Sequence, residues 1–185
     1  MKKMLFIYNP KSGQGQIRNH LSAILEKLSA GGYDLTVYPT KESMDACRIV
    51  CQRAGEFDLI VCSGGDGTLN EVVTGLMQGG ITRCVGYIPA GSTNDFANSL
   101  GLPRQMDKAA QLIVDGTPFS CDIGKFNKDY FVYVAAFGMF TDVSYQTKQE
   151  MKNLFGHAAY VLEGMKRIGN WKSVHLVVES TEYTG

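Results

Sequence analysis

Apolar residues along the first 115 positions fall into two alternating patterns. Short apolar runs predict β-strands at residues 5–8, 35–38, 58–62 and 84–88. Between and after these runs, apolar residues recur three and four positions apart, which predicts helices at about 17–28, 43–54, 69–76 and 107–114. Strands that alternate with helices predict an α/β fold, in which a parallel sheet is flanked by helices on both sides.

Two of these segments allow finer expectations. The run Asp58–Cys62 has no polar interruption after its first residue, which predicts a strand buried on both faces. In the second helix we expect Met44, Cys47, Val50 and Cys51 to form the packed face. Cys47 and Cys51 also have the spacing of two metal ligands, but packing is the stronger interpretation because two ligands are too few.

The pattern changes after Gly116. Paired strands are expected at 119–126 and 130–137 around the turn 127–129, followed by a helix at about 149–167 and a strand at 173–179. We therefore predict an α/β domain over residues 1–118. Residues 119–185 are predicted to be an incomplete β-rich domain with one inserted helix.

Composition narrows the class of protein. The 185 residues are 44% hydrophobic and 19% charged, which is enough apolar material for a sizeable core. Lys plus Arg and Asp plus Glu are both 18, so the chain lacks the basic excess of a dedicated nucleic-acid binder, and no nucleic-acid partner is expected. Five cysteines form no disulfide framework, and the N-terminal apolar run is too short for a signal peptide. A cytoplasmic protein is expected.

Polar segments follow all four predicted strands of the sheet. They are Asn9–Gly13, Thr40, Gly64–Thr68 and Pro89–Asp95. In parallel sheets, ligands bind beyond the carboxyl ends of the strands. We therefore expect these four segments to meet at one edge and to form the functional site.

The segment Ser63–Glu71, with the sequence SGGDGTLNE, carries the clearest chemistry. Glycines allow backbone N–H groups to face a phosphate at a helix N-terminus, and Asp66 beside a phosphate requires a cation, which indicates a magnesium nucleotide. Thr68 either caps the helix or donates to a phosphate. The alternative is a tight strand-to-helix turn in which Asp66 is a capping residue.

The neighbouring loops strengthen the phosphate interpretation. In Asn9–Gly15, Lys11 and backbone donors are suited to phosphate, although Ser12 as a helix cap is an equal alternative. Pro89–Asp95 carries two hydroxyls, an amide and a carboxylate, which is more than the capping of the short helix after it requires.

Three motifs together, NPKSG at 9–13, GGDGT at 64–68 and GSTNDFA at 91–97, resemble the diacylglycerol kinase catalytic domain family. The resemblance implies an α/β domain followed by a β-sandwich domain, with ATP and Mg²⁺ bound between them. It implies that Asp66, Asp95 and Asp122 form an acidic network around the Mg²⁺, directly or through water. It also implies ATP contacts from Asn9, Pro10, Lys11, Ser12, Gly13, Thr40, Gly64, Gly65, Asp66, Gly67, Thr68, Leu69, Asn70 and Ser92.

The implied function is ATP-dependent transfer of the γ-phosphate to the hydroxyl of diacylglycerol or a related lipid alcohol. An NAD kinase-like enzyme and a non-catalytic nucleotide-binding module remain alternatives. The family's general base is expected beyond residue 185, so we predict that this chain alone retains a nucleotide site but is weakly active or inactive.

The expected partners are a lipid alcohol substrate and, transiently, the inner face of the membrane; a homodimer is also left open. A membrane role could involve basic residues beside apolar ones, although packing between domains or subunits is the favoured interpretation of this stretch. The residues concerned are Met139, Phe140, Tyr145, Lys148, Met151, Lys152, Leu154, Phe155, Met165, Lys166, Arg167 and Lys172.

Overall fold

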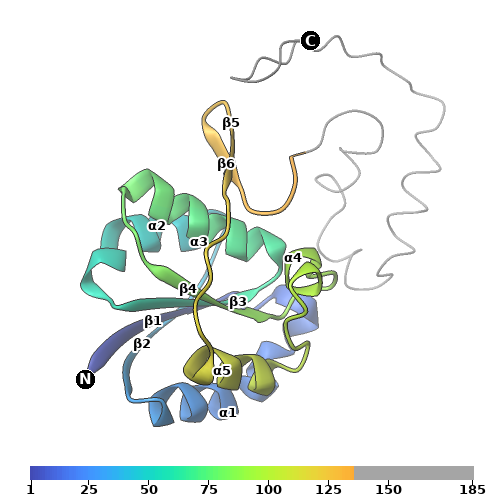
Figure 1. The fold of residues 1–185 in the computed structure, drawn as a ribbon. Coiled ribbons are helices and arrows are strands. Elements are labelled where there is room, and N and C mark those ends of the chain that lie inside the picture. Colours follow the sequence, from blue (N-terminus) through green and yellow to red (C-terminus); the bar gives the residue numbers. More distant parts are fainter. Residues whose placement is uncertain (136–185) are drawn as a thin grey trace, which may run out of the picture. The chain divides into compact units, whose positions relative to one another are not determined.

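The computed structural model describes residues 1–135, and a four-stranded parallel sheet lies at their centre (Figure 1). The strand order is β2 (Tyr33–Pro39), β1 (Lys2–Tyr8), β3 (Leu59–Gly64) and β4 (Cys84–Pro89). Every neighbouring pair is parallel, which confirms the predicted class of sheet.

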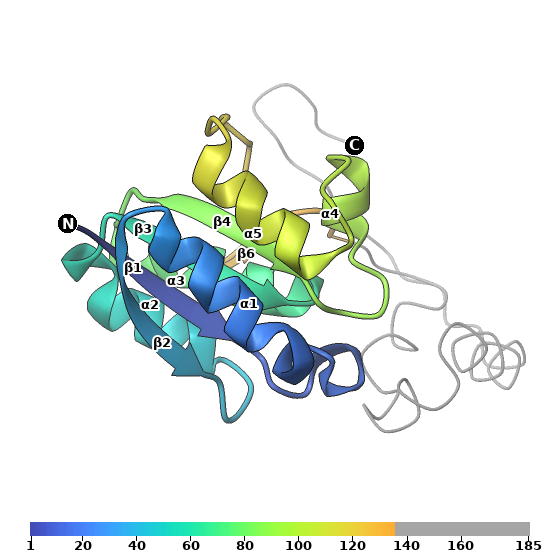
Figure 2. The same cartoon turned by 90° about the horizontal axis from the view of Figure 1, so that it is seen from below.

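Helices cover both faces of this sheet (Figure 2). Helices α1 (Ile17–Ala30) and α5 (Met106–Asp115) pack together on one face, and α2 (Asp45–Arg53) and α3 (Asp66–Gly79) pack together on the other. The short elements are the 3₁₀ turns η1 (Ser12–Gly15) and η2 (Ala54–Glu56) and the helix α4 (Asp95–Ser99). The predicted alternation of strands and helices is therefore confirmed.

The sheet separates two hydrophobic cores. In β1, Met4 and Phe6 point to the core of α1 and α5, whereas Leu5 and Ile7 point to the core of α2 and α3. These four side chains have no exposed surface. The strand β3 has the same character, since the side chains of residues 60–62 are fully buried, as its unbroken apolar run predicted.

The predicted face of α2 is only half right. Cys47 and Val50 are buried, but Cys51 is exposed and Met44 is 50% exposed. The helix begins at Asp45, and Met44 precedes it in the left-handed backbone region (φ 65°), so Met44 takes no place on the helical face. Ala46 and Ile49 complete the buried face instead.

The hairpin predicted after Gly116 exists, but its strands are short. β5 (Gly124–Phe126) pairs antiparallel with β6 (Asp129–Phe131), and Asn127 in the turn has a left-handed backbone (φ 55°). Residues 116–123 contain no helix or strand. Pro118 has no N–H to donate to a sheet, and residues 116–122 are exposed, so nothing favours a strand there.

The hairpin packs on α3, and residues 1–135 form one compact unit. The domain boundary after residue 118 stays a prediction. The expected end of the second hairpin strand at 136–137, the helix at 149–167, the strand at 173–179 and the apolar and basic stretch from Met139 to Lys172 lie outside the described residues. Within residues 1–135, no helix is long and apolar enough to cross a membrane.

Candidate functional site

The loop after β1 is held against β3 and against the loop after β4. The Asn9 N–H donates to the carbonyl oxygen of Ser63, at 2.9 Å, and the Asn9 side chain accepts from the Lys11 N–H, also at 2.9 Å. Gly13 has a left-handed backbone (φ 52°), and a Cβ atom there would collide with the carbonyl oxygen of Ala90. The loops after β1 and β4 are thus in direct contact.

The loop after β3 enters α3 without a side-chain cap. Gly65 is the N-cap residue, so the interpretations of Asp66 or Thr68 as the cap of this helix are wrong. Thr68 is buried and packs over Gly64, where a Cβ would lie 2.5 Å from the Thr68 Cβ. Ser12, in the neighbouring loop, also forms no side-chain cap.

Asp66 bonds to a different helix. Its carboxylate accepts the N–H groups of Asp95 and Phe96, at 3.0 and 3.1 Å, and therefore caps the N-terminus of α4. The interpretation of Asp66 as a capping residue was thus right about the role but wrong about the helix. This contact ties the loop after β3 to the loop after β4.

Glycine also allows these two loops to touch. A Cβ on Gly91 would lie 2.5 Å from the Cα of Gly65 and 2.7 Å from the Asn94 side-chain oxygen. Asn94, with a left-handed backbone (φ 55°), accepts from the Gly91 N–H at 2.8 Å and donates to the Gly91 carbonyl oxygen at 2.9 Å. The Tyr87 hydroxyl lies 3.2 Å from the Gly64 carbonyl oxygen, and burial raises the pKa of this phenol.

The fourth loop, after β2, joins the same edge through its backbone. The Thr40 N–H donates to the carbonyl oxygen of Tyr8, at 2.9 Å, directly before Asn9. Thr40 itself is 9% exposed. The four polar segments therefore meet at the carboxyl edge of the sheet, as the sequence predicted.

Two of the residues expected to contact the nucleotide use their side chains in contacts within the protein. Leu69 is 3% exposed and belongs to the core between the sheet, α2 and α3. Asn70 accepts the Val132 N–H at 3.2 Å, which holds the segment after β6 against α3. The remaining expected contacts, including the exposed Lys11 and Ser92, lie in the four converging loops or at the adjoining ends of β3 and α3.

The three expected metal-binding carboxylates are not assembled into one cluster. Asp66 is bonded to α4, Asp95 is exposed on α4, and Asp122 is exposed before β5. Among residues 1–135, no three His, Cys, Asp or Glu side chains lie close enough together to hold a metal ion. One buried side-chain oxygen in this part of the chain, the hydroxyl of Ser63 at the base of the loops, has no hydrogen-bond partner.

Sequence reasoning missed Asp45. Its side chain is buried at the start of α2 and accepts hydrogen bonds from the Tyr38 hydroxyl at 3.1 Å and the Lys41 N–H at 2.9 Å, and it pairs with Arg48. A polar residue before a predicted helix usually indicates a cap on the surface. Nothing in the apolar pattern indicated a buried carboxylate.

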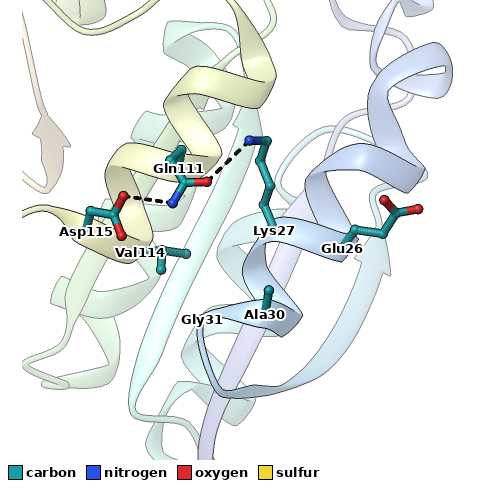
Figure 3. A pocket seen from close by; sticks show the side chains of 7 residues that line it. All are labelled: Glu26, Lys27, Ala30, Gly31, Gln111, Val114 and Asp115. Carbon is teal, nitrogen blue, oxygen red and sulfur yellow. Dashed lines mark hydrogen bonds between the residues drawn. The ribbon is translucent and has the colours of Figure 1, made fainter.

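A groove of about 420 Å³ lies elsewhere, between the C-terminal ends of α1 and α5 (Figure 3). Lys27 donates to Gln111 at 3.3 Å, and Gln111 donates to Asp115 at 2.7 Å. The groove lies where α1 leads into the start of β2, whereas the converging loops follow the ends of the strands. Its side-chain bonds join α1 to α5 and belong to the packing of these helices.

Known proteins are similar to this chain in sequence and in fold. The pattern of the diacylglycerol kinase catalytic domain matches residues 3–126. A diacylglycerol kinase of Bacillus subtilis (strain 168) is 38% identical over 97% of this chain and 60% of its own length. One from Staphylococcus aureus (strain MRSA252) is 38% identical over 96% of this chain and 57% of its own length.

A solved structure of a putative diacylglycerol kinase from Bacillus anthracis str. Sterne matches with a TM-score of 0.66 and 38% identity. The matched region covers 70% of this chain and 47% of the Bacillus anthracis chain. The chain thus spans less than two thirds of the relatives it matches. On the sequence match and the shared fold, the chain belongs to the diacylglycerol kinase catalytic domain family.

Proposed function

We propose that this protein is an ATP-dependent lipid kinase, which transfers the γ-phosphate of ATP to the hydroxyl of diacylglycerol or a related lipid alcohol. One observation carries the proposal: the loops after all four strands meet at one edge of the sheet, with Gly13 against Ala90 and Gly65 against Gly91. The relatives named diacylglycerol kinase support the acceptor class.

The glycine contacts suit a polyphosphate. With no side chains at Gly65 and Gly91, the backbones of the two loops approach each other closely. Asp66 and Gly67 open α3, at positions whose N–H groups have no acceptor within their own helix. These donors and the positive end of the helix dipole favour an anion there.

Mg²⁺ fits the site as an ion that arrives with the nucleotide. Magnesium is usually bound by one or two carboxylates together with phosphates and water, so Asp66, Asp95 and Asp122 are compatible with it although the three form no cage. We propose that these carboxylates contact it directly or through water. When bound, Mg²⁺ would neutralise charge on the phosphates.

The residues of this chain would bind and orient the nucleotide. Asn9–Gly13 and Gly64–Thr68 would surround the phosphates, Lys11 would supply a positive charge, and Ser92 would donate its hydroxyl. Electrostatic stabilisation and alignment account for most of the catalysis in phosphoryl transfer. The base that deprotonates the lipid hydroxyl is proposed to come from outside these 185 residues.

The proposal includes a location. A lipid acceptor requires the enzyme to reach a membrane surface, so we propose a cytoplasmic protein that associates with the inner face of the membrane during catalysis. The oligomeric state, for which the sequence left a homodimer open, is a separate point. Vesicle co-sedimentation and analytical ultracentrifugation test these two points separately from catalysis.

A transfer assay tests the central proposal. The protein at its full natural length is incubated with radiolabelled ATP, Mg²⁺ and either diacylglycerol micelles or NAD⁺. Labelled phosphatidic acid is expected, and Asp66→Asn should abolish it while circular dichroism remains unchanged. Labelled NADP⁺ in place of phosphatidic acid would instead support an NAD kinase-like enzyme. ATP binding without transfer of phosphate to any lipid alcohol would contradict the proposal that the protein is a lipid kinase.

A further inference from the structure

Asp45 is a buried carboxylate to which the proposed function gives no role. It is 1% exposed and begins α2, at the same sheet edge as the converging loops. A buried charge is costly unless it is paired and hydrogen-bonded. Asp45 meets this condition through three donors, which are the Tyr38 hydroxyl, the Lys41 N–H and the Arg48 guanidinium.

These donors keep Asp45 ionised. Burial acts to raise the pKa of the Asp45 carboxyl, but the hydrogen bonds from Lys41, Tyr38 and Arg48 outweigh it and hold this pKa below its usual value. The hydrogen bond to Asp45 likewise raises the pKa of Arg48. The side chain of Arg48 is 56% exposed, so the pair is open to water on one side while the carboxylate is enclosed.

The bond to Lys41 determines the path of the backbone after β2. Lys41 follows Thr40, whose N–H donates to Tyr8 at 2.9 Å, and Tyr8 leads directly into Asn9. On the other side of the turn, Met44 is held in the left-handed region, which is unfavourable for a residue with a side chain. Asp45 therefore holds closed a turn that would otherwise open toward solvent.

A second bond fixes the start of α2 from the side of α3. The Ala46 N–H donates to Glu71 at 3.3 Å, and Glu71 ends the SGGDGTLNE segment. The turn 40–44 is thus tied to Tyr8, at the end of β1, through Thr40, and to the carboxylate of Asp45 through Lys41. Ala46, directly after the turn, ties the start of α2 to α3. All of these attachments lie next to loops assigned to the phosphates.

We propose that Asp45 is a positioning residue of the nucleotide site, whose carboxylate holds the turn 40–44 closed and keeps Thr40 beside the Asn9–Gly13 loop. The inference rests on the proposed nucleotide binding and extends it to a residue that does not touch the ligand. Removing the carboxylate frees the Lys41 N–H and lets Thr40 move away. The affinity for ATP then falls because one wall of the site is no longer ordered before the ligand arrives.

Two substitutions separate the charge from the hydrogen bond. Asp45→Asn keeps an oxygen acceptor for the Lys41 N–H, and Asp45→Ala removes it. Isothermal titration of the 185-residue chain with ATP and Mg²⁺ should show a dissociation constant raised about tenfold for Asp45→Ala and less for Asp45→Asn. Asp34→Asn is the matched control, since Asp34 is exposed near the start of β2, at the opposite end of this strand from the turn 40–44, and the variant's affinity should be unchanged.

A nuclear magnetic resonance readout distinguishes positioning from general stability. In ¹H–¹⁵N spectra, the Lys41 and Thr40 amides should shift and exchange faster with solvent in Asp45→Ala, while the amides of β3 and β4 keep their positions. If Asp45→Ala does not fold, Asp45→Asn and Tyr38→Phe carry the test. Wild-type affinity for ATP in both Asp45→Asn and Tyr38→Phe would then overturn the inference.

The outcomes also separate this inference from the proposed function. If the wild-type chain does not bind ATP, the proposed nucleotide site fails, and the inference falls with it. If the wild type binds ATP and a folded Asp45→Ala binds equally well, only the role of Asp45 is wrong. A raised dissociation constant together with displaced Thr40 and Lys41 amides supports both.

Discussion

Gly91 shows at the scale of one residue why the loops at this sheet edge are rich in glycine. Its backbone lies against that of Gly65, and a Cβ would come within 2.5 Å of the Gly65 Cα. Since backbone cannot move aside as a flexible side chain does, any larger residue must push the loops after β3 and β4 apart.

Gly91→Ala should therefore lower the free energy of unfolding by about 1–3 kcal/mol, as overpacking in a close-packed region does. Urea denaturation followed by circular dichroism measures this change. Gly55→Ala is the matched control, because a Cβ at Gly55 meets no atom within 4 Å and should leave stability nearly unchanged. Equal midpoints for the two variants would show that the loops are not packed as described.

The sequence indicated that these glycines lie in one site, but not which pairs of them touch. Strand ends in a parallel sheet meet at one edge, so convergence follows from the alternation of elements alone. The burial of Asp45, in contrast, could not be predicted from the alternation of elements. Its burial involves a donor from Tyr38, which lies across the turn on β2, and one from Arg48, which lies three residues later on α2.

Helix α4 depends, at the scale of an element, on a residue outside it. It has five residues, and its first N–H groups are bonded to the carboxylate of Asp66. So short a helix has little stability of its own, because the free-energy cost of nucleating a helix exceeds the stabilisation from the hydrogen bonds of a single turn. Asp66 therefore has two tasks, one in holding α4 and one proposed at the nucleotide.

Asp66→Ala should expose this dependence. The loss of the cap is expected to cost about 0.5–2 kcal/mol and to speed amide exchange at Asp95 and Phe96. Asp66→Asn keeps one acceptor oxygen and should have a smaller effect, which is why it is the better variant for the transfer assay. Asp95→Asn, at an exposed side chain of the same helix, is the control. Unchanged exchange in Asp66→Ala would show that α4 is held by other contacts.

The short hairpin marks a limit of prediction at this scale. Apolar residues from Phe119 and after Phe131 suggested longer strands, but β5 and β6 have three residues each. Phe119 and Val134 are both 63% exposed, so an apolar residue here is no sign of a buried strand. The predicted turn is present, and its residue Asn127 has a left-handed backbone, which asparagine tolerates.

Across the described part of the molecule, the sheet and its four main helices were predictable because each strand has its own apolar run and each helix its own apolar spacing. These patterns do not determine the order β2–β1–β3–β4, since strands that follow one another in the sequence need not be neighbours in the sheet. Residues 1–135 have a hydrophobic core on each face of the sheet. Such packing on both faces is what an α/β domain requires to fold independently.

A chain ending at Ala135 should therefore fold and bind ATP by itself. Its thermal unfolding should be a single cooperative transition, because both cores share the buried strands β1 and β3 and neither can open without the other. Its dissociation constant for ATP should lie close to that of the 185-residue chain if the four loops supply the binding contacts. Calorimetry and isothermal titration on both chains provide the comparison. A folded 1–135 segment with no measurable ATP binding would place essential nucleotide contacts beyond Ala135, and a broad, non-cooperative transition would mean that the two cores do not form one folding unit.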